Sequence, residues 1–189
     1  MARPREFDRD IALAEAIRVF ADHGYEGSST DMLLKRMGIS RQSLYDTFGD
    51  KKRLYLEALR RYNGTSTAEI IATLHAQASP AKGLEAALFD FAARPAGYGC
   101  LGVCSIVEFG DGAADVAAIN HASGATLAAA FEAVIAKGKA VGDFAADLDG
   151  KAATGFLAAT LAGMKVAARG GASPEALRGI ARMALRSLT

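Results

Sequence analysis

The stretch MGISRQSLYDTFGDKKRLYLEAL, residues Met37 to Leu59, decides the fold of this chain. It opens with a glycine that favours a tight turn, and Ser40 then stands where its side chain can cap a new helix. That helix begins with the triplet Arg41, Gln42 and Ser43, and a second helix follows a Gly-Asp break and opens on two lysines. The stretch therefore predicts a short helix whose polar amino end lies beside a basic segment.

Two further helices are predicted upstream of this stretch. Apolar residues at positions 13, 16, 17 and 20 follow the i, i+3, i+4, i+7 spacing of an amphipathic helix, which predicts a helix from Asp8 to about His23. A cap at Ser29 or Thr30 predicts a short helix over residues 31–37. Because a glycine turn separates that helix from the next one, over residues 41–47, the two form a helix-turn-helix.

The remainder of the chain also favours helices, and no stretch is typical of a strand. Ser79 and Ser173 each precede a proline, which is a signal for the start of a helix. Residues 95–99 are expected to form a loop. Helices are predicted over residues 51 to about 78, from 80 onward, and over 101–109, 113–137, 151–168 and 174–188. The sequence therefore predicts an all-α fold.

The composition is typical of a globular protein in a reducing compartment. Hydrophobic residues make up 51% and charged residues 23% of the 189 residues. No apolar run approaches the ~18 residues that a membrane span requires, and the charged amino terminus lacks the apolar region of a signal peptide. Two cysteines without an export signal do not indicate a disulfide framework. We expect a cytoplasmic protein with no membrane partner.

The net charge of +1 conceals a basic segment. Residues 35–61 hold eight Lys and Arg side chains but only three Asp and Glu. A charge run of this kind is often only a solvated helix face, but here it surrounds a helix-turn-helix, which favours a polyanionic partner. Further upstream, Arg3 and Arg5 are expected to form either a minor-groove arm or a disordered tail.

The expected partner is double-stranded DNA. Arg41, Gln42 and Ser43 stand at the end of the helix that meets base edges in a helix-turn-helix. Arg pairs well with guanine and Gln with adenine. Tyr45 can reach a phosphate with its hydroxyl, and Lys51 opens the next helix, where its side chain and the backbone N–H groups can hold phosphate.

Residues 20–59, FADHGYEGSSTDMLLKRMGISRQSLYDTFGDKKRLYLEAL, resemble the amino-terminal domain of the TetR family of transcriptional regulators. The residues at the family's spacing are Phe20, Gly24-Tyr25, Ser29-Thr30, Gly38-Ile39-Ser40, Ser43-Leu44-Tyr45, Phe48 and Lys51. Ala21 and Met37 depart from common family residues, and neither is a groove-facing position. The resemblance implies that the DNA contacts are made by Ser29, Thr30, Ser40, Arg41, Gln42, Ser43, Tyr45 and Lys51.

The resemblance also implies how the chain is organised. A three-helix helix-turn-helix DNA-binding domain, residues 1–50, would be followed by a larger helical ligand-binding and dimerisation domain, residues 51–189, with residues 51–78 as a shared helix. The protein would act as a homodimer, most often as a repressor that a small apolar or aromatic effector releases from its operator. The effector itself is not specified by the sequence.

Two sets of residues follow from this expected organisation. The last two helices would pair with their counterparts in a four-helix bundle, through an interface formed by Leu157, Leu161, Leu177, Ala181, Leu185 and Leu188. The effector pocket would be lined by Phe89, Cys100, Cys104, Phe109, Phe131, Phe156 and Met164. Apolar residues at helical spacing are also typical of a plain core, so this interpretation stays open for the pocket.

The two cysteines leave an alternative function open. Cys100 and Cys104, four residues apart, would share one face of a helix. Free cysteines are usually buried small hydrophobes. In a repressor that senses oxidants or electrophiles, Cys100 at the helix start would be the more reactive thiol and Cys104 the more buried one.

Other classes of function lack their motifs. The sequence has no phosphate-binding glycine motif, no nucleophile elbow and no HExxH. Two thiols and three scattered histidines do not form a metal-ligand set. We expect no enzymatic activity, no metal and no cofactor. A purely structural DNA-binding protein without an effector is a further alternative, although the size of the second domain argues against it.

Overall fold

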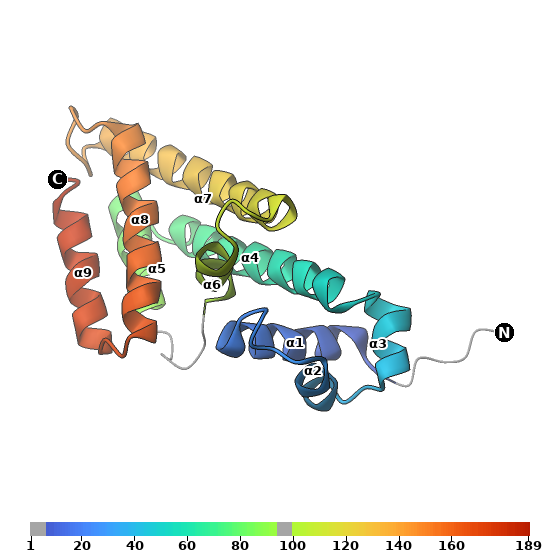
Figure 1. Cartoon of the computed structure of the whole chain (residues 1–189). Helices are drawn as coiled ribbons and strands as arrows, with labels where there is room; N and C mark the ends of the chain where they lie inside the picture. Colours follow the sequence, from blue (N-terminus) through green and yellow to red (C-terminus); the bar gives the residue numbers. More distant parts are fainter. Residues whose placement is uncertain (1–6, 94–99) are drawn as a thin grey trace. The chain divides into compact units, whose positions relative to one another are not determined.

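The computed structural model describes residues 7–93 and 100–189, and every regular element in these ranges is a helix (Figure 1). The helices are α1 Arg9–His23, α2 Thr30–Met37, α3 Arg41–Phe48, α4 Lys51–His75, α5 Pro80–Ala93, α6 Leu101–Phe109, α7 Ala114–Val141, α8 Gly150–Arg169 and α9 Pro174–Arg186. The predicted all-α fold is confirmed. The loop expected at residues 95–99 and the two arginines at positions 3 and 5 lie outside the described residues.

The first three helices each begin at a capping side chain, and two of these caps, Ser29 and Ser40, are the ones that the sequence predicts. Asp8 accepts hydrogen bonds from the backbone N–H groups of the first turn of α1, and Ser29 and Ser40 do the same for α2 and α3. Gly38 ends α2 in the left-handed conformation, with φ of 67°, which only glycine adopts without a steric cost. The tight turn between α2 and α3 therefore follows from local sequence.

Helix α7 is longer than the sequence predicted. It continues past Gly138 to Val141. Gly138 does not end the helix; its missing side chain leaves room for the Phe144 ring. A Cβ atom at Gly138 would lie 2.2 Å from the Phe144 ring, far inside van der Waals contact. Gly138 thus lets the aromatic ring of the following connection pack directly on the helix backbone.

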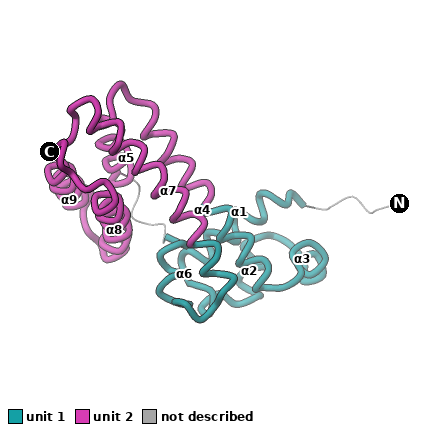
Figure 2. Tube along the Cα trace, turned by 90° about the horizontal axis from the view of Figure 1, so that it is seen from above, with its two compact units in different colours: residues 1–63, 98–120 teal, residues 64–97, 121–189 magenta. Residues whose placement is uncertain are grey.

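The described chain forms two compact units, coloured separately in Figure 2. Unit 1 comprises residues 1–63 and 98–120, and unit 2 comprises residues 64–97 and 121–189. Helices α4 and α7 each contribute residues to both units. Unit 1 thus contains α6 and the first part of α7 together with the helix-turn-helix. The functional boundary expected at residue 50 stays a prediction.

Each unit has its own hydrophobic core. In unit 1, Phe20, Leu33, Leu44 and Tyr55 are fully buried with residues of α6 and α7 around them. In unit 2, the core is formed by buried side chains of α4, α5, α7, α8 and α9, among them Phe131. The helix-turn-helix is therefore supported by a core that includes a helix far away in sequence.

Candidate nucleic-acid interface

The amino end of α3 presents its polar side chains on a rigid support. Leu44 and Phe48 on the other face of this short helix are buried in the core of unit 1. Arg41 and Gln42, in its first turn, are exposed, and Ser43 is half-buried. The apolar face fixes the orientation of α3, so the exposed face is held in position to meet another molecule.

Each of the three predicted base readers already has a partner on the same motif. Arg41 Nη2 donates to Asp31 Oδ1 on α2 at 2.6 Å, and Gln42 Nε2 donates to Asp46 Oδ1 at 2.7 Å. The Ser43 hydroxyl lies 2.9 Å from the Ser40 hydroxyl. The Arg41 side chain therefore reaches from the first turn of α3 to the first turn of α2.

Of the other residues predicted to contact DNA on α2 and α3, the two serines also cap helices. Ser29 Oγ and Ser40 Oγ are acceptors for backbone N–H groups, at 3.1 and 3.0 Å. Thr30 is half-buried at the start of α2. Tyr45 is 48% exposed, so part of its side chain is open to another molecule. A serine oxygen that caps a helix keeps its own proton for a phosphate.

Lys51, at the start of α4, lies against the turn between α1 and α2. Its ammonium group is 4.3 Å from the centre of the Tyr25 ring, which is a cation–π contact. The neighbouring Lys52 contacts the Phe109 ring at 4.6 Å and Asp115 at 3.3 Å. Although burial alone would raise it, a backbone N–H bond and the Lys52 ammonium lower the pKa of Asp115. The Lys52 ammonium therefore already has two partners within unit 1.

A contact that the sequence does not predict joins α6 to the turn that carries Tyr25. Glu108 on α6 accepts hydrogen bonds from the backbone N–H groups of Tyr25 at 2.8 Å and Glu26 at 2.7 Å. Gly24, with φ of 73°, lies so close that an added Cβ would be 3.0 Å from Glu108 Oε2. Because 83 residues separate Glu108 from Tyr25, no local sequence signal could have shown this contact.

The aromatic cluster beneath this turn contains a buried hydroxyl. Tyr55 packs edge-on against Phe20 and Tyr25, with ring centres 5.0 and 5.1 Å apart. Its hydroxyl is fully buried and has no hydrogen-bond partner among the described residues. Burial, reinforced by the nearby Glu108 carboxylate, raises the pKa of Tyr55 well above its usual value, and Ser105 only partly offsets this.

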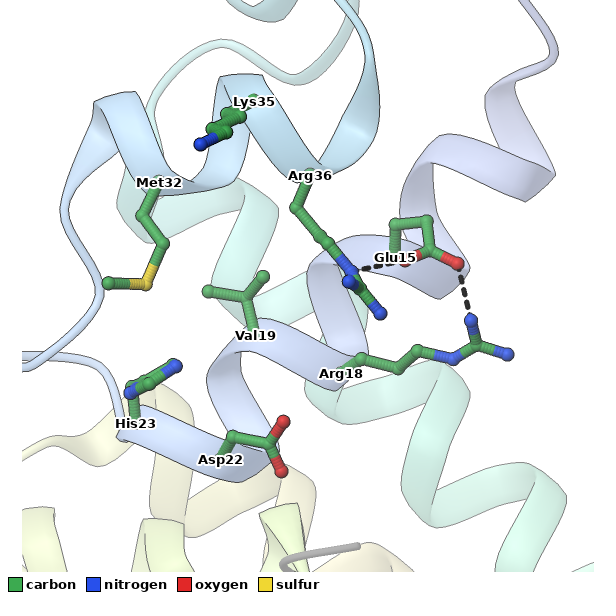
Figure 3. A pocket seen from close by; sticks show the side chains of 8 residues that line it. All are labelled: Glu15, Arg18, Val19, Asp22, His23, Met32, Lys35 and Arg36. Carbon is green, nitrogen blue, oxygen red and sulfur yellow. Dashed lines mark hydrogen bonds and ion pairs between the residues drawn. The ribbon is translucent and has the colours of Figure 1, made fainter.

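A hollow of about 660 Å³ lies between α1 and α2 of unit 1 (Figure 3). Glu15 is central to it: its carboxylate pairs with Arg36 at 2.7 Å and also with Arg18. Both arginines are therefore neutralised locally. The residues that line the hollow are Glu15, Arg18, Val19, Asp22, His23, Met32, Lys35 and Arg36, and none is a predicted DNA contact.

The residues predicted for the effector pocket are divided between the two units. Cys100, Cys104 and Phe109 belong to unit 1, whereas Phe89, Phe131, Phe156 and Met164 belong to unit 2. Phe131 and Met164 are fully buried in the core of unit 2, and Phe89 packs against that core. Phe156 is 46% exposed, so it does not line an enclosed cavity of unit 2. The pocket stays a prediction.

The order of burial expected for the cysteines is wrong. Cys100 is the buried residue, with 8% of its surface exposed, and Cys104 is half-buried. The reason is that Cys100 caps α6, with Sγ 3.5 Å from the backbone nitrogen of Val103, and is thereby turned toward the protein. The thiol one turn further along the helix is the more accessible one.

Five of the six residues predicted for the dimer interface are buried within unit 2 itself, so their side chains are not available to a second copy, and the interface itself stays a prediction. Most of them are buried in the core of unit 2, with at most 4% of their surface exposed, namely Leu157, Leu161, Leu177, Ala181 and Leu188. Leu185 is partly buried against the same core. Side chains enclosed by their own unit cannot also contact a second copy. The exposed apolar side chains of these two helices are instead Phe156, Val166, Ile180 and Met183.

None of the helices in residues 7–93 and 100–189 has the length and apolar character needed to cross a membrane. Within the same ranges, no three His, Cys, Asp or Glu side chains gather as ligands for a metal ion.

Known proteins match the chain both in part and as a whole. The sequence model described as "Bacterial regulatory proteins, tetR family" matches residues 12–58. The HTH-type transcriptional repressor ComR of Escherichia coli is 30% identical over 97% of this chain and 90% of its own length. The uncharacterized HTH-type transcriptional regulator YezE of Bacillus subtilis is 46% identical, over 42% of this chain and 41% of its own length.

A solved structure has the same fold over the whole chain. A cysteine mutant of the TetR family transcriptional regulator CifR, complexed with a 26 bp double-strand operator DNA, has a TM-score of 0.88. It is 32% identical, and the match covers 100% of both chains. The reduced form of Escherichia coli NemR has the same fold, with a TM-score of 0.85 at 18% identity.

Proposed function

The chain belongs to the TetR family of transcriptional regulators, and on this premise we propose that it is a homodimeric repressor that binds one operator sequence. The observation that carries the proposal is the amino end of α3. Arg41 and Gln42 are exposed there, while Leu44 and Phe48 anchor the same helix in the core. A helix held in this way is the reading element of a helix-turn-helix.

Three groups of side chains would contact DNA in different ways. Arg41 and Gln42 have the donors and acceptors that read guanine and adenine in the major groove. Tyr45 and Lys51, at the surface beside them, would hold phosphates and set the register of α3. Ser29, Thr30 and Ser40 lie at the starts of α2 and α3, where unpaired backbone N–H groups also favour a phosphate.

Repression rather than activation is supported by the names of several relatives. ComR of Escherichia coli and AcnR of Corynebacterium glutamicum are both described as repressors, and ComR matches along nearly the whole chain. FasR of Mycolicibacterium smegmatis, described as an activator, is 33% identical over 47% of this chain. A protein that occupies promoter DNA represses by excluding polymerase, which needs no additional contact surface.

The homodimer would form through the outward faces of α8 and α9. Phe156 and Val166 on α8 and Ile180 and Met183 on α9 are exposed apolar side chains, between 38% and 64% accessible. Apolar side chains of this size, grouped on two packed helices, favour association. Two copies related by a two-fold axis would present two α3 helices to successive major grooves of an inverted repeat.

The effector would be a small apolar or aromatic molecule bound among the helices of the second domain. The aromatic and methionine side chains of unit 2, such as Phe89, Phe131 and Met164, favour such a ligand. It would release DNA only if it binds the DNA-free conformation more tightly than the DNA-bound one. A purely structural DNA-binding protein would show no such ligand dependence.

A second candidate is a repressor that senses electrophiles or oxidants through a thiol. The favouring observation is the half-buried thiol of Cys104, which lies in unit 1 on the same helix as Glu108. Modification of Cys104 would disturb α6 and, through Glu108, the turn that carries Tyr25. Cys104→Ser would abolish a response to a quinone in this case and would leave a response to a non-covalent effector unchanged.

A reporter experiment tests the proposed function. The chain is expressed in cells that carry a reporter promoter overlapping an operator obtained by selection from random DNA. We expect repression by the wild type and weaker repression by Gln42→Ala at equal protein levels. Increased transcription would show an activator, and equal transcription with and without the chain would contradict the regulatory function at that operator.

A further inference from the structure

Two of the three predicted base readers of α3, Arg41 and Gln42, are held by carboxylates. We propose that Asp31 and Asp46 are specificity-determining residues of this motif, because they hold Arg41 and Gln42 in the donor arrangement that reads a base pair. The observations are the bonds of Arg41 to Asp31 at 2.6 Å and of Gln42 to Asp46 at 2.7 Å. The inference rests on the proposed function, since it concerns the residues that would read DNA.

For Gln42, the Asp46 carboxylate sets the orientation of the side-chain amide. A carboxylate only accepts hydrogen bonds, so the Nε2 end of Gln42 must face Asp46. The second N–H of Nε2 and the Oε1 atom then remain for the N7 and N6 groups of adenine. Without Asp46, the amide can turn over and present its donor and acceptor in the reverse order, which no longer distinguishes adenine.

For Arg41, the carboxylate ties the guanidinium to a second helix. Asp31 lies on α2, ten residues before Arg41, and it takes one N–H of the Nη2 group. The guanidinium has five N–H donors in a fixed plane. Anchoring one of them sets the plane of the group and leaves a pair of parallel donors for O6 and N7 of guanine.

The ion pair between Arg41 and Asp31 contributes little to the stability of the fold. The Asp31 side chain is 83% and the Arg41 side chain 55% exposed, and exposed ion pairs contribute little. Both carboxylates also lie at a surface that would face phosphates, where negative charge weakens binding to any DNA. They therefore suppress binding to unrelated sequences while they favour the correct base pair.

Removal of either carboxylate should strengthen binding to random DNA and weaken discrimination between base pairs. The full-length variants Asp46→Ala and Asp31→Ala are compared with Glu26→Ala, which removes an exposed charge from the α1–α2 turn without touching a reader. Dissociation constants are measured for an operator selected from random DNA, for its single base-pair variants and for random-sequence DNA. In both Asp variants we expect tighter binding to random DNA and a loss of discrimination of at least about fivefold at the base pair each reader contacts. Glu26→Ala should tighten binding to all sequences equally.

A double-mutant cycle separates positioning from a general charge effect. In the Gln42→Ala background, Asp46→Ala should no longer change discrimination at that base pair, because its action requires Gln42. A uniform gain in affinity with unchanged base preference in both Asp variants would overturn the inference and leave the proposed function intact. A wild-type chain with no base preference at all would instead overturn the proposed function.

Discussion

At the scale of single residues, Tyr55 combines close packing with a buried polar group that has no partner among the described residues. Its ring makes close aromatic contacts in the core of unit 1, but its buried hydroxyl has no hydrogen-bond partner among the described residues. The nearby Ser105 hydroxyl donates instead to the Gly102 carbonyl at 2.7 Å. A buried polar group without a partner costs about 1–3 kcal/mol.

Tyr55→Phe should therefore raise the free energy of unfolding by about 1 kcal/mol at neutral pH. The difference in stability between the variant and the wild type should grow above pH 10. The unfolded chain releases this phenol proton above its usual pKa of 10.0, whereas burial raises the pKa in the folded chain. The wild type thus loses stability above pH 10, and the variant lacks this contribution. Urea unfolding at pH 7 and above pH 10 measures both effects, and a destabilised variant at pH 7 would show that the hydroxyl is hydrogen-bonded.

Lys51→Ala should weaken binding to all DNA sequences alike. The Lys51 ammonium stands at the start of α4, above the Tyr25 ring, where it can reach a phosphate. Loss of one phosphate contact should lower the slope of log K against log salt by about one. Titrations at several salt concentrations measure the slope. The control is Lys82→Ala on α5, an exposed lysine in unit 2, and equal slopes for the two variants would refute the phosphate contact.

Some residue contacts could be read from the sequence and others could not. Gln42 and Asp46 are four residues apart on one helix, so their contact follows from helical spacing. The contact of Arg41 with Asp31 depends on the angle between two helices, and that of Glu108 with Tyr25 depends on the packing of α6. Spacing predicts neighbours within an element, whereas contacts between elements require the fold.

At the scale of elements, one carboxylate of α6 adds hydrogen bonds to the core contacts that α6 makes with the amino-terminal helices. Glu108 accepts hydrogen bonds from two backbone N–H groups of the α1–α2 turn, and that turn positions the ring of Tyr25 under Lys51. All these residues belong to unit 1. A displacement of α6 would therefore reach a predicted phosphate contact through a short chain of residues.

Glu108→Ala should destabilise the fold by about 1 kcal/mol, because two backbone N–H groups lose a charged acceptor. The loss is limited because water can partly take the place of the carboxylate. It should also lower DNA affinity severalfold. Glu108→Gln keeps one acceptor oxygen and should give an intermediate effect on both quantities. Urea unfolding and DNA titration measure them, with the exposed Glu132→Ala on α7 as control. Wild-type DNA affinity in Glu108→Ala would show that the turn is positioned without this carboxylate.

The helices themselves were largely readable from the sequence because their ends are locally encoded. Capping side chains at Asp8, Ser29, Ser40 and Ser173 begin four of them. The faces of α8 and α9 were not readable in the same way. Both helices have apolar residues on more than one face, and periodicity does not tell which face meets the monomer core. Leu161 was assigned to the outer face for this reason.

At the scale of the whole molecule, the exposed apolar side chains of α8 and α9 predict where two copies meet. Met183→Arg, at a side chain 64% exposed, should give a folded monomer, because it places a charge in the proposed interface without disturbing the core. Leu161→Arg, at a side chain 4% exposed, should instead unfold unit 2. Sedimentation and circular dichroism distinguish the two outcomes.

The control for this prediction is Val107→Arg, which charges an apolar side chain of α6 that is 81% exposed. This variant should remain a dimer. A dimeric Met183→Arg of normal stability would place the interface on another surface.

The central claim is that the amino end of α3 reads operator DNA in each of two subunits. Selection of bound sequences from random double-stranded DNA, with wild type and Gln42→Ala side by side, tests it most directly. The wild type should enrich an inverted repeat whose half-sites are centred one helical turn, or a multiple of it, apart. Gln42→Ala should lose the preference at one base pair in each half-site and keep the rest. An identical enriched sequence for both proteins, or no enriched sequence for the wild type, would contradict the claim.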